Sequence, residues 1–104
     1  MINNGHSARK IWATEYGTFT NGPLSDAGAV QTEAGQATHL DTAMKLWKTY
    51  DFAGPMMIYE LRDMNTADGG IDGNDATTRE NHFGHALHTD RSVKPARAVF
   101  IANK

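Results

Sequence analysis

The chain has 104 residues, 39% of them hydrophobic, with 10 basic and 12 acidic side chains and a formal net charge of −2. This length allows one small domain, and the mean hydropathy of −0.54 indicates a polar surface. The near-neutral charge balance gives no electrostatic reason to expect nucleic acid or an anionic membrane as a partner. Because the sequence contains no cysteine, disulfides and thiolate metal sites are excluded.

Targeting signals are not evident in the sequence. The first part of the chain lacks the apolar segment of a signal peptide, so none is expected. No apolar run approaches the roughly 20 residues that a helix needs to span a bilayer. These observations leave the localisation open.

Two short apolar segments predict β-strands. The first, at about residues 10–16, reads KIWATEY and suits a buried strand that is closed by Gly17. The second, at about residues 56–61, reads MMIYEL and is also followed by charged residues. Polar segments rich in glycine and other small residues predict loops at residues 1–8, 17–28 and 63–81.

A helix is expected between the two strands, at about residues 32–50. Leu40, Met44 and Trp47 follow one another at i, i+4 and i+7 and therefore share a face, with Ala37 one turn earlier. Thr32 has the side chain of a helix N-cap. The Gly54-Pro55 pair is expected to mark the end of the helical region.

A second, shorter helix is expected at about residues 94–102. Pro95 suits its first turn, and Val99 and Phe100 are expected to pack inward. The order strand, helix, strand, helix predicts an α/β fold with a parallel sheet and a right-handed crossover. Two strands buried on both faces need further neighbours, so residues 1–104 are expected to form a single partial domain that associates with something else.

Four segments resemble parts of one enzyme family: KIWATEYG, AMKLWKTYDFAGPMMIYELRD, ENHFG and KPARAVF. Together they resemble the C-terminal end of a retaining (β/α)8-barrel glycoside hydrolase, of the clan with cellulase-like and xylosidase-like members. The resemblance extends over most of the chain and implies a βαβα segment, the last quarter of a TIM barrel. A complete barrel of this kind has about 250 residues, so this chain would supply only strands seven and eight with their helices.

The resemblance gives Glu15 the position of the catalytic nucleophile, at the end of strand seven. Active sites of such barrels lie at the C-terminal ends of the strands. If Glu15 points to the barrel axis, strand alternation places Ile11 and Ala13 with it, and Trp12 and Thr14 against the helices. The alternative from the sequence pattern alone is a strand-end glutamate that is simply solvated.

The resemblance also implies substrate-binding roles for Tyr59 and Tyr16. Tyr59 stands where the clan usually has a tryptophan that forms the floor of the sugar subsite, and an aromatic ring suits the apolar face of a sugar. The alternative for Tyr59 is a core tyrosine. Glu60 and Asp63 are expected to have structural or rim roles, with Arg62 near enough to pair with an acid. The acid/base residue of the clan comes from the fourth strand, and this chain has no such segment.

Two further motifs could bind metal ions. The segment ADGGIDGNDATT, residues 67–78, has oxygen ligands among glycines, as calcium sites do, but its spacing does not fit an EF-hand. His82, His85 and His88 recur every third residue, but Phe83 and its apolar neighbours indicate ordinary packing. We expect a polar loop and packed histidines, with no metal and no cofactor.

The sequence therefore predicts a glycoside hydrolase-like fragment that acts on carbohydrate and carries the nucleophile half of a retaining β-glycosidase site. The alternative is a non-catalytic module derived from a barrel, which self-associates or binds other proteins. In both cases we expect a homo-oligomer or association with the missing barrel remainder, because a lone quarter exposes a sheet edge and an apolar face.

Overall fold

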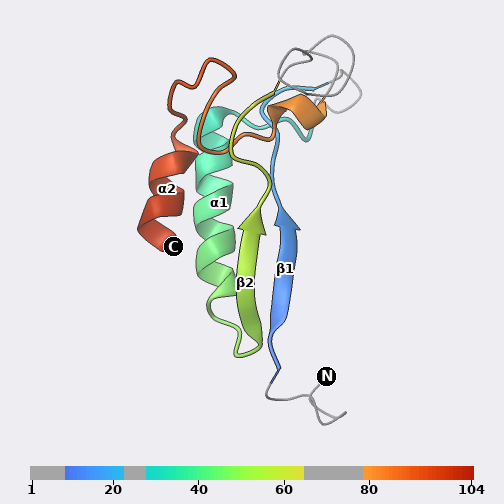
Figure 1. Ribbon diagram of the computed structural model, residues 1–104, viewed down its shortest axis with the longest axis vertical. Helices are drawn as coiled ribbons and strands as arrows, with labels where there is room; N and C mark the ends of the chain where they lie inside the picture. Colours follow the sequence, from blue (N-terminus) through green and yellow to red (C-terminus); the bar gives the residue numbers. More distant parts are fainter. Residues whose placement is uncertain (1–8, 23–27, 65–78) are drawn as a thin grey trace.

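The computed structural model describes residues 9–22, 28–64 and 79–104 of the chain. In this part the order of elements is β1 (Ile11–Tyr16), α1 (Glu33–Trp47), β2 (Ala53–Ile58), a 3-10 helix η5 (Arg79–His82) and α2 (Ala96–Asn103). The two strands lie side by side with α1 next to β2 and α2 beyond α1 (Figure 1). The predicted loop at residues 1–8, and most of the predicted loop at residues 63–81, lie outside the described residues.

Helix α1 forms for the reasons that the sequence indicates. The Thr32 hydroxyl accepts a hydrogen bond from the Gly35 backbone N–H at 2.9 Å, which confirms Thr32 as the N-cap. Leu40 and Met44 are buried on the face that the periodicity predicts. The helix ends at Trp47, three residues before the predicted end, and residues 48–50 form a turn.

The two strands pair in parallel, with Ile11 opposite Ala53 and Tyr16 opposite Ile58, which confirms the predicted βαβ unit. The second strand, however, begins and ends three residues earlier than predicted. Gly54 and Pro55, expected to mark the end of the helical region, are part of β2. Proline is tolerated there because, among the described residues, β2 pairs only with β1 and is an edge strand.

The buried apolar core is small. It consists of Leu40, Met44 and Ala96, and partly buried apolar residues of both strands and both helices pack against it. Fully or nearly fully buried polar residues are more numerous than this apolar set: Gln36, Asp63, Asn81, His85, Lys94 and Asn103. The molecule is therefore held together to a large extent by buried polar contacts.

The expectation that the first strand is buried is wrong, because only Ala13 and Tyr16 are partly buried and the other four residues are exposed. Trp12 is 57% exposed and Ile11 is 39% exposed, because the described sheet has only two strands and nothing covers this part of it. The Trp12 ring lies beside Gly54 of β2, where a Cβ would be 2.9 Å from the ring, and the expected position of Trp12 against the helices stays a prediction. The apolar side chains of β1 are therefore only partly covered by the described residues.

Helix α2 begins one residue after Pro95 and packs along α1. Ala96 and Asn103 are buried and Val99 packs against the core, as expected for Val99. The prediction that Phe100 packs inward is wrong, since Phe100 is 41% exposed. Successive residues of a helix point about 100° apart, so Val99 and Phe100 do not share the same contact with α1.

None of the helices in the described part of the chain is both long enough and apolar enough to cross a membrane.

Candidate functional site

The carboxyl ends of β1 and β2 meet at the same edge of the sheet, because the strands are parallel (Figure 1). Pairing continues one residue beyond β2, where the Tyr59 N–H donates to the Tyr16 carbonyl at 2.7 Å. The Tyr59 backbone therefore lies beside that of Tyr16, and Glu15 is the neighbour of Tyr16 in β1. The edge is where a parallel α/β fold places its ligands.

Glu15 is exposed, and the neighbouring Tyr16 shows which way it faces. The Tyr16 hydroxyl donates to the His39 carbonyl of α1 at 3.1 Å, and the Tyr16 ring packs against the core. Successive side chains of a regular strand point to opposite faces, so from Tyr16 we infer that Glu15 lies on the face turned away from α1, in a stretch where the register with β2 shifts between Ala13 and Tyr16. This is the orientation that a carboxylate needs in order to meet a ligand outside the helix layer.

Tyr16 thus lies on the helix side of the sheet. Burial raises the pKa of its phenol, which accords with a hydroxyl that bonds to the α1 backbone. This packing explains why β1 and α1 hold a fixed orientation next to Glu15. Contact with α1 is the role that the structure gives to this side chain, and its substrate-binding role stays a prediction.

Tyr59 is 36% exposed and belongs to a row of aromatic rings. The centroids of the Tyr59 and Phe83 rings are 5.4 Å apart, and those of Phe83 and Phe19 are 5.3 Å apart. Both pairs are tilted, a favourable geometry for aromatic contacts. The sequence did not indicate that Phe19 and Phe83 would join Tyr59, because the three residues come from separate segments.

Gly17 makes the close packing at this edge possible. A Cβ at this position would lie 2.2 Å from the Tyr59 carbonyl oxygen and 3.0 Å from the Phe83 ring. A side chain would therefore collide with the backbone that follows β2. The peptide bond that comes next, between Tyr59 and Glu60, is cis.

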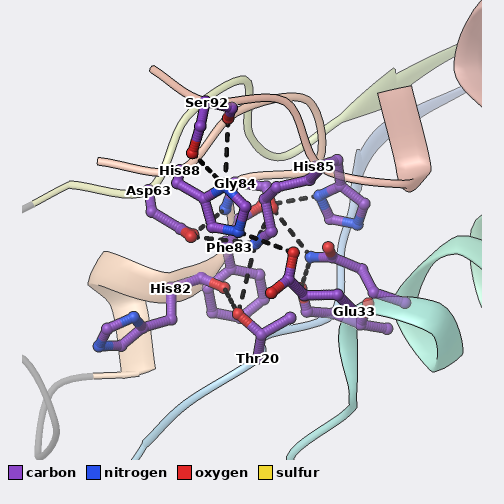
Figure 2. A network of polar contacts seen from close by, with 12 residues as sticks. Thr20, Glu33, Asp63, His82, Phe83, Gly84, His85, His88 and Ser92 are labelled. Atoms are coloured by element: carbon purple, nitrogen blue, oxygen red, sulfur yellow. Dashed lines mark hydrogen bonds and ion pairs between the residues drawn. The ribbon is translucent and has the colours of Figure 1, made fainter. Parts of the chain in front are cut away.

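A buried ion pair lies behind this edge. Lys94 Nζ donates to Asp63 Oδ2 at 3.0 Å and to the Gly84 carbonyl at 2.6 Å, and the Gly84 N–H donates to Asp63 Oδ1 at 2.8 Å. Gln36 Nε2 of α1 donates to the same Gly84 carbonyl at 3.0 Å. We call Gln36, Asp63, Gly84 and Lys94 the polar cluster. Figure 2 shows the hydrogen bonds and ion pairs around the segment from His82 to His85.

The polar cluster settles the role of one of the two carboxylates after β2. Asp63 is structural, as predicted, but its partner is Lys94. Arg62, which the sequence placed near an acid, donates to the Thr89 carbonyl at 2.8 Å. Lys94 could have been suspected from its place in the KPARAVF segment, although nothing in the periodicity marks it as buried.

Glu60 has a different environment. Its side chain is partly buried, and burial together with the charge of Asp63 raises the pKa of its carboxyl group. It lines a pocket that neither Glu15 nor Tyr59 lines. The described carboxylates after β2 therefore do not supply an evident partner for Glu15.

The three histidines of the HFGHALH segment do not meet. His85 Nδ1 lies 2.7 Å from the Phe83 carbonyl oxygen, whereas His88 Nε2 contacts Glu33 Oε1 at 2.7 Å (Figure 2). Within residues 9–22, 28–64 and 79–104 there is no group of three or more histidine or carboxylate side chains that could hold a metal ion. The possible calcium segment at residues 67–78 lies outside the described residues.

Comparisons with solved structures show what the fold is similar to. The chain matches β-glucuronidase from Ruminococcus gnavus with a TM-score of 0.62 and 25% identity, over 88% of this chain and 14% of that chain. It also matches the same enzyme in complex with uronic isofagomine, with a TM-score of 0.60, 24% identity and coverage of 84% and 14%. The complex with uronic deoxynojirimycin gives a TM-score of 0.59, 23% identity and coverage of 83% and 14%.

No protein-family model matches the chain, and a search of curated proteins gave no match. The chain spans 14% of the length of the structures it resembles, which are barrel-type glycoside hydrolases. The similarity therefore supports an α/β segment of the kind found in a barrel glycoside hydrolase, as the sequence predicted, at this coarse level. It does not bear on the cellulase-like and xylosidase-like assignment.

Proposed function

We propose that this chain carries the nucleophile half of a retaining β-glycosidase site, with Glu15 as the nucleophile and Tyr59 as part of the sugar platform. The observation that carries the proposal is the position of Glu15, which is exposed at the carboxyl end of β1 on the face opposite α1. The similarity to part of a β-glucuronidase supports a carbohydrate as the ligand. The proposal does not require a cofactor.

The chemistry assigned to Glu15 is attack by its carboxylate on the anomeric carbon of a sugar. A bond forms between the carboxylate oxygen and that carbon, and the leaving group departs with the electron pair of the broken bond. Water then hydrolyses the glycosyl ester and regenerates the carboxylate. The first step with a natural glycoside also needs an acid that protonates the leaving oxygen, placed about 5–5.5 Å from the nucleophile in retaining enzymes.

That acid is the part of the site that we assign to a segment outside this chain. Asp63 is already engaged by Lys94, and Glu60 lines a separate pocket. General acid catalysis contributes about 10²–10⁴-fold to a rate. We therefore expect no useful turnover of unactivated glycosides by the isolated chain. A robust rate on such a substrate that Glu15→Gln abolishes would contradict this division of the site.

The proposed nucleophile can be tested without the acid by using a substrate whose leaving group needs no proton. The chain is incubated with 2-deoxy-2-fluoro-β-D-glucuronosyl fluoride, and the mass of the intact protein is measured. The expected result is one covalent sugar adduct, which peptide mapping places on Glu15. Glu15→Gln should lose the adduct, and Glu33→Gln, a matched change at the start of α1, should retain it. An adduct that survives in Glu15→Gln would show that Glu15 is not the nucleophile.

The second candidate function is that of a non-catalytic module that self-associates or binds another protein. The exposed apolar residues favour it, notably Trp12 on β1 and Met57 and Leu61 on and after β2. Surfaces of this kind mark interaction sites in soluble proteins. The two candidates are distinguished by the labelling experiment, because a module without a sugar site forms no adduct at Glu15 even when it is folded and oligomeric.

A further inference from the structure

A pocket lies beside β2 and is separate from Glu15. It is a cavity of about 280 Å³ between β2, the segment that follows it, residues 85–86 and α2. Six of its eight lining residues are apolar, among them Met57, Ile58 and Phe100, and the other two are Glu60 and His85. The volume is just below the range of about 300–1,000 Å³ that is usual for small-molecule pockets, which are mostly apolar with a few polar groups.

His85 presents an unsatisfied acceptor in this region. Its side chain is almost fully buried, with 3% exposed. Nδ1 lies 2.7 Å from the Phe83 carbonyl oxygen, and because a carbonyl only accepts, Nδ1 must carry the proton. Nε2 is then a lone-pair acceptor, and it is buried without a hydrogen-bond partner among the described residues. Burial, together with the charge of Lys94, lowers the pKa of the ring, which keeps His85 neutral near pH 7.

Glu60 adds a carboxylate to the same pocket. Within residues 9–22, 28–64 and 79–104 no hydrogen bond to this carboxylate is found. Burial first, and then the negative charge of Asp63, raise the pKa of its carboxyl group, as expected for a carboxylate without a counter-charge. A buried acceptor that lacks a donor is costly, and a ligand that supplies the donor recovers that free energy.

We propose that this pocket binds a small primary amine with an apolar body. The ammonium group would donate to the Glu60 carboxylate and to His85 Nε2, and the hydrocarbon part would contact the apolar wall around Phe100. An ammonium group suits this pocket better than a hydroxyl group because it has several donors and a charge opposite to that of Glu60. The site shares no lining residue with the edge that holds Glu15 and Tyr59, and it does not depend on the proposed glycosidase function.

The test uses the full ¹⁵N-labelled chain at pH 7.5 and three probes of equal length: hexylamine, 1-hexanol and hexanoate. Binding is followed by NMR from the Ala86 amide and from the His85 ring nitrogens. We expect hexylamine to bind about tenfold or more tightly than hexanol, as a charge-assisted hydrogen bond allows, and hexanoate not to bind. The Nε2 signal of His85 should shift with hexylamine. Equal affinity for hexanoate would overturn the proposal.

Variants separate the pocket from the rest of the chain. Glu60→Gln should reduce hexylamine affinity about tenfold and leave hexanol affinity nearly unchanged. Ala86→Leu narrows the pocket without changing either polar side chain and should abolish binding of both hexylamine and hexanol. This variant tests the pocket without a substitution at the buried His85. Glu33→Gln, at an acid of α1 that does not line the pocket, is the matched control for Glu60→Gln and should bind hexylamine as the original chain does. Unchanged hexylamine binding in both Glu60→Gln and Ala86→Leu would show that the pocket is not the site.

The remaining possibility is that the pocket is a contact between copies of the chain. Light scattering at the concentrations used for NMR distinguishes the two cases. If the Ala86 amide shifts with protein concentration alone and hexylamine has no effect on it, the pocket is covered by a second copy and the proposal is wrong. If the shift follows hexylamine at constant molecular mass, the proposal holds.

Discussion

The polar cluster and the two-stranded sheet show opposite relations to solvent. In the polar cluster Lys94 is 1% exposed and Asp63 is 6% exposed, and each is bonded to the other and to Gly84. In the sheet, apolar side chains such as Trp12 and Met57 are exposed. The charged groups of the polar cluster therefore find their partners within this chain. The apolar side chains of the sheet are left in contact with solvent. The exposed apolar residues indicate that the sheet is a surface through which this chain is expected to contact a neighbour.

The largest expected effect is at the buried ion pair. Lys94→Met retains the volume of the side chain but leaves the Asp63 carboxylate buried without its cation. Breaking a buried pair in this way costs about 3–5 kcal/mol, a large share of the stability of a small domain. We expect a circular dichroism melt to lose its cooperative transition. Lys45→Met, which removes the exposed pair with Asp41, is the control and should leave the melt nearly unchanged.

A melt of Lys94→Met that matches that of the original chain would mean that the polar cluster does not hold the C-terminal edge together. The buried charges would then not account for the stability of this region.

The second largest effect is expected at Gly17, where β1 contacts the chain after β2. Gly17→Ala places a Cβ 2.2 Å from the Tyr59 carbonyl oxygen, a collision with backbone that only a shift of the chain relieves. Overpacking of this kind costs about 1–3 kcal/mol. Gly28→Ala is the matched control, because a Cβ there meets nothing within 4 Å. The free energy of unfolding from urea titration should fall for the first variant and not for the second.

Equal stability of the two alanine variants would show that β1 and the Tyr59 backbone are farther apart in solution. The hydrogen bond between the Tyr59 N–H and the Tyr16 carbonyl would then not fix the two strand ends to each other.

The exposed side of the sheet predicts self-association or binding to further barrel segments. The solution mass, measured by light scattering, should exceed the 11.4 kDa of one chain, together with a cooperative melt. Trp12→Lys, at a residue that is 57% exposed and does not line the pocket beside β2, should shift the mass toward that of the monomer without a large loss of helix signal. A monomer with a cooperative melt at all concentrations would show that the chain needs no neighbour.

The smallest expected effect concerns pH and His85. The pKa of this ring is lowered in the folded chain, chiefly by burial, so below its ordinary value of 6.5 the unfolded state binds the proton more readily than the folded state. The stability contributed by neutral His85 is therefore complete above pH 6.5 and is lost as the pH falls through the folded pKa. An NMR titration of the ring should give a midpoint below 6.5. A midpoint at or above 6.5 would contradict the buried, neutral ring on which the amine site depends.

Local structure could largely be predicted from the sequence. The helix between the strands follows from Leu40 and Met44 one turn apart, and its start follows from Thr32, because capping and helical periodicity act over a few neighbouring residues. Parallel pairing of the strands follows from the alternation of strand and helix. The position of Glu15 near the end of β1 is likewise a property of the local sequence.

Which side chains are buried, and which residues they contact, could not be predicted in this way. The apolar Trp12 and Phe100 are exposed, because whether a side chain is covered depends on which distant segments lie against it, and none of the described residues covers these two. Pro55 joined the strand because β2 lies at an edge of the described sheet.

The order of the elements, the helix that joins the strands and the carboxylate near the end of β1 therefore follow from the sequence alone, since each depends on residues close together in the chain. The folded structure was needed to show that Asp63 pairs with Lys94, that Phe83 and Phe19 extend the row of rings from Tyr59, and that Glu60 and His85 share a pocket. These contacts join residues far apart in the chain. Their energies come from desolvation and close packing, which exist only once the segments have come together.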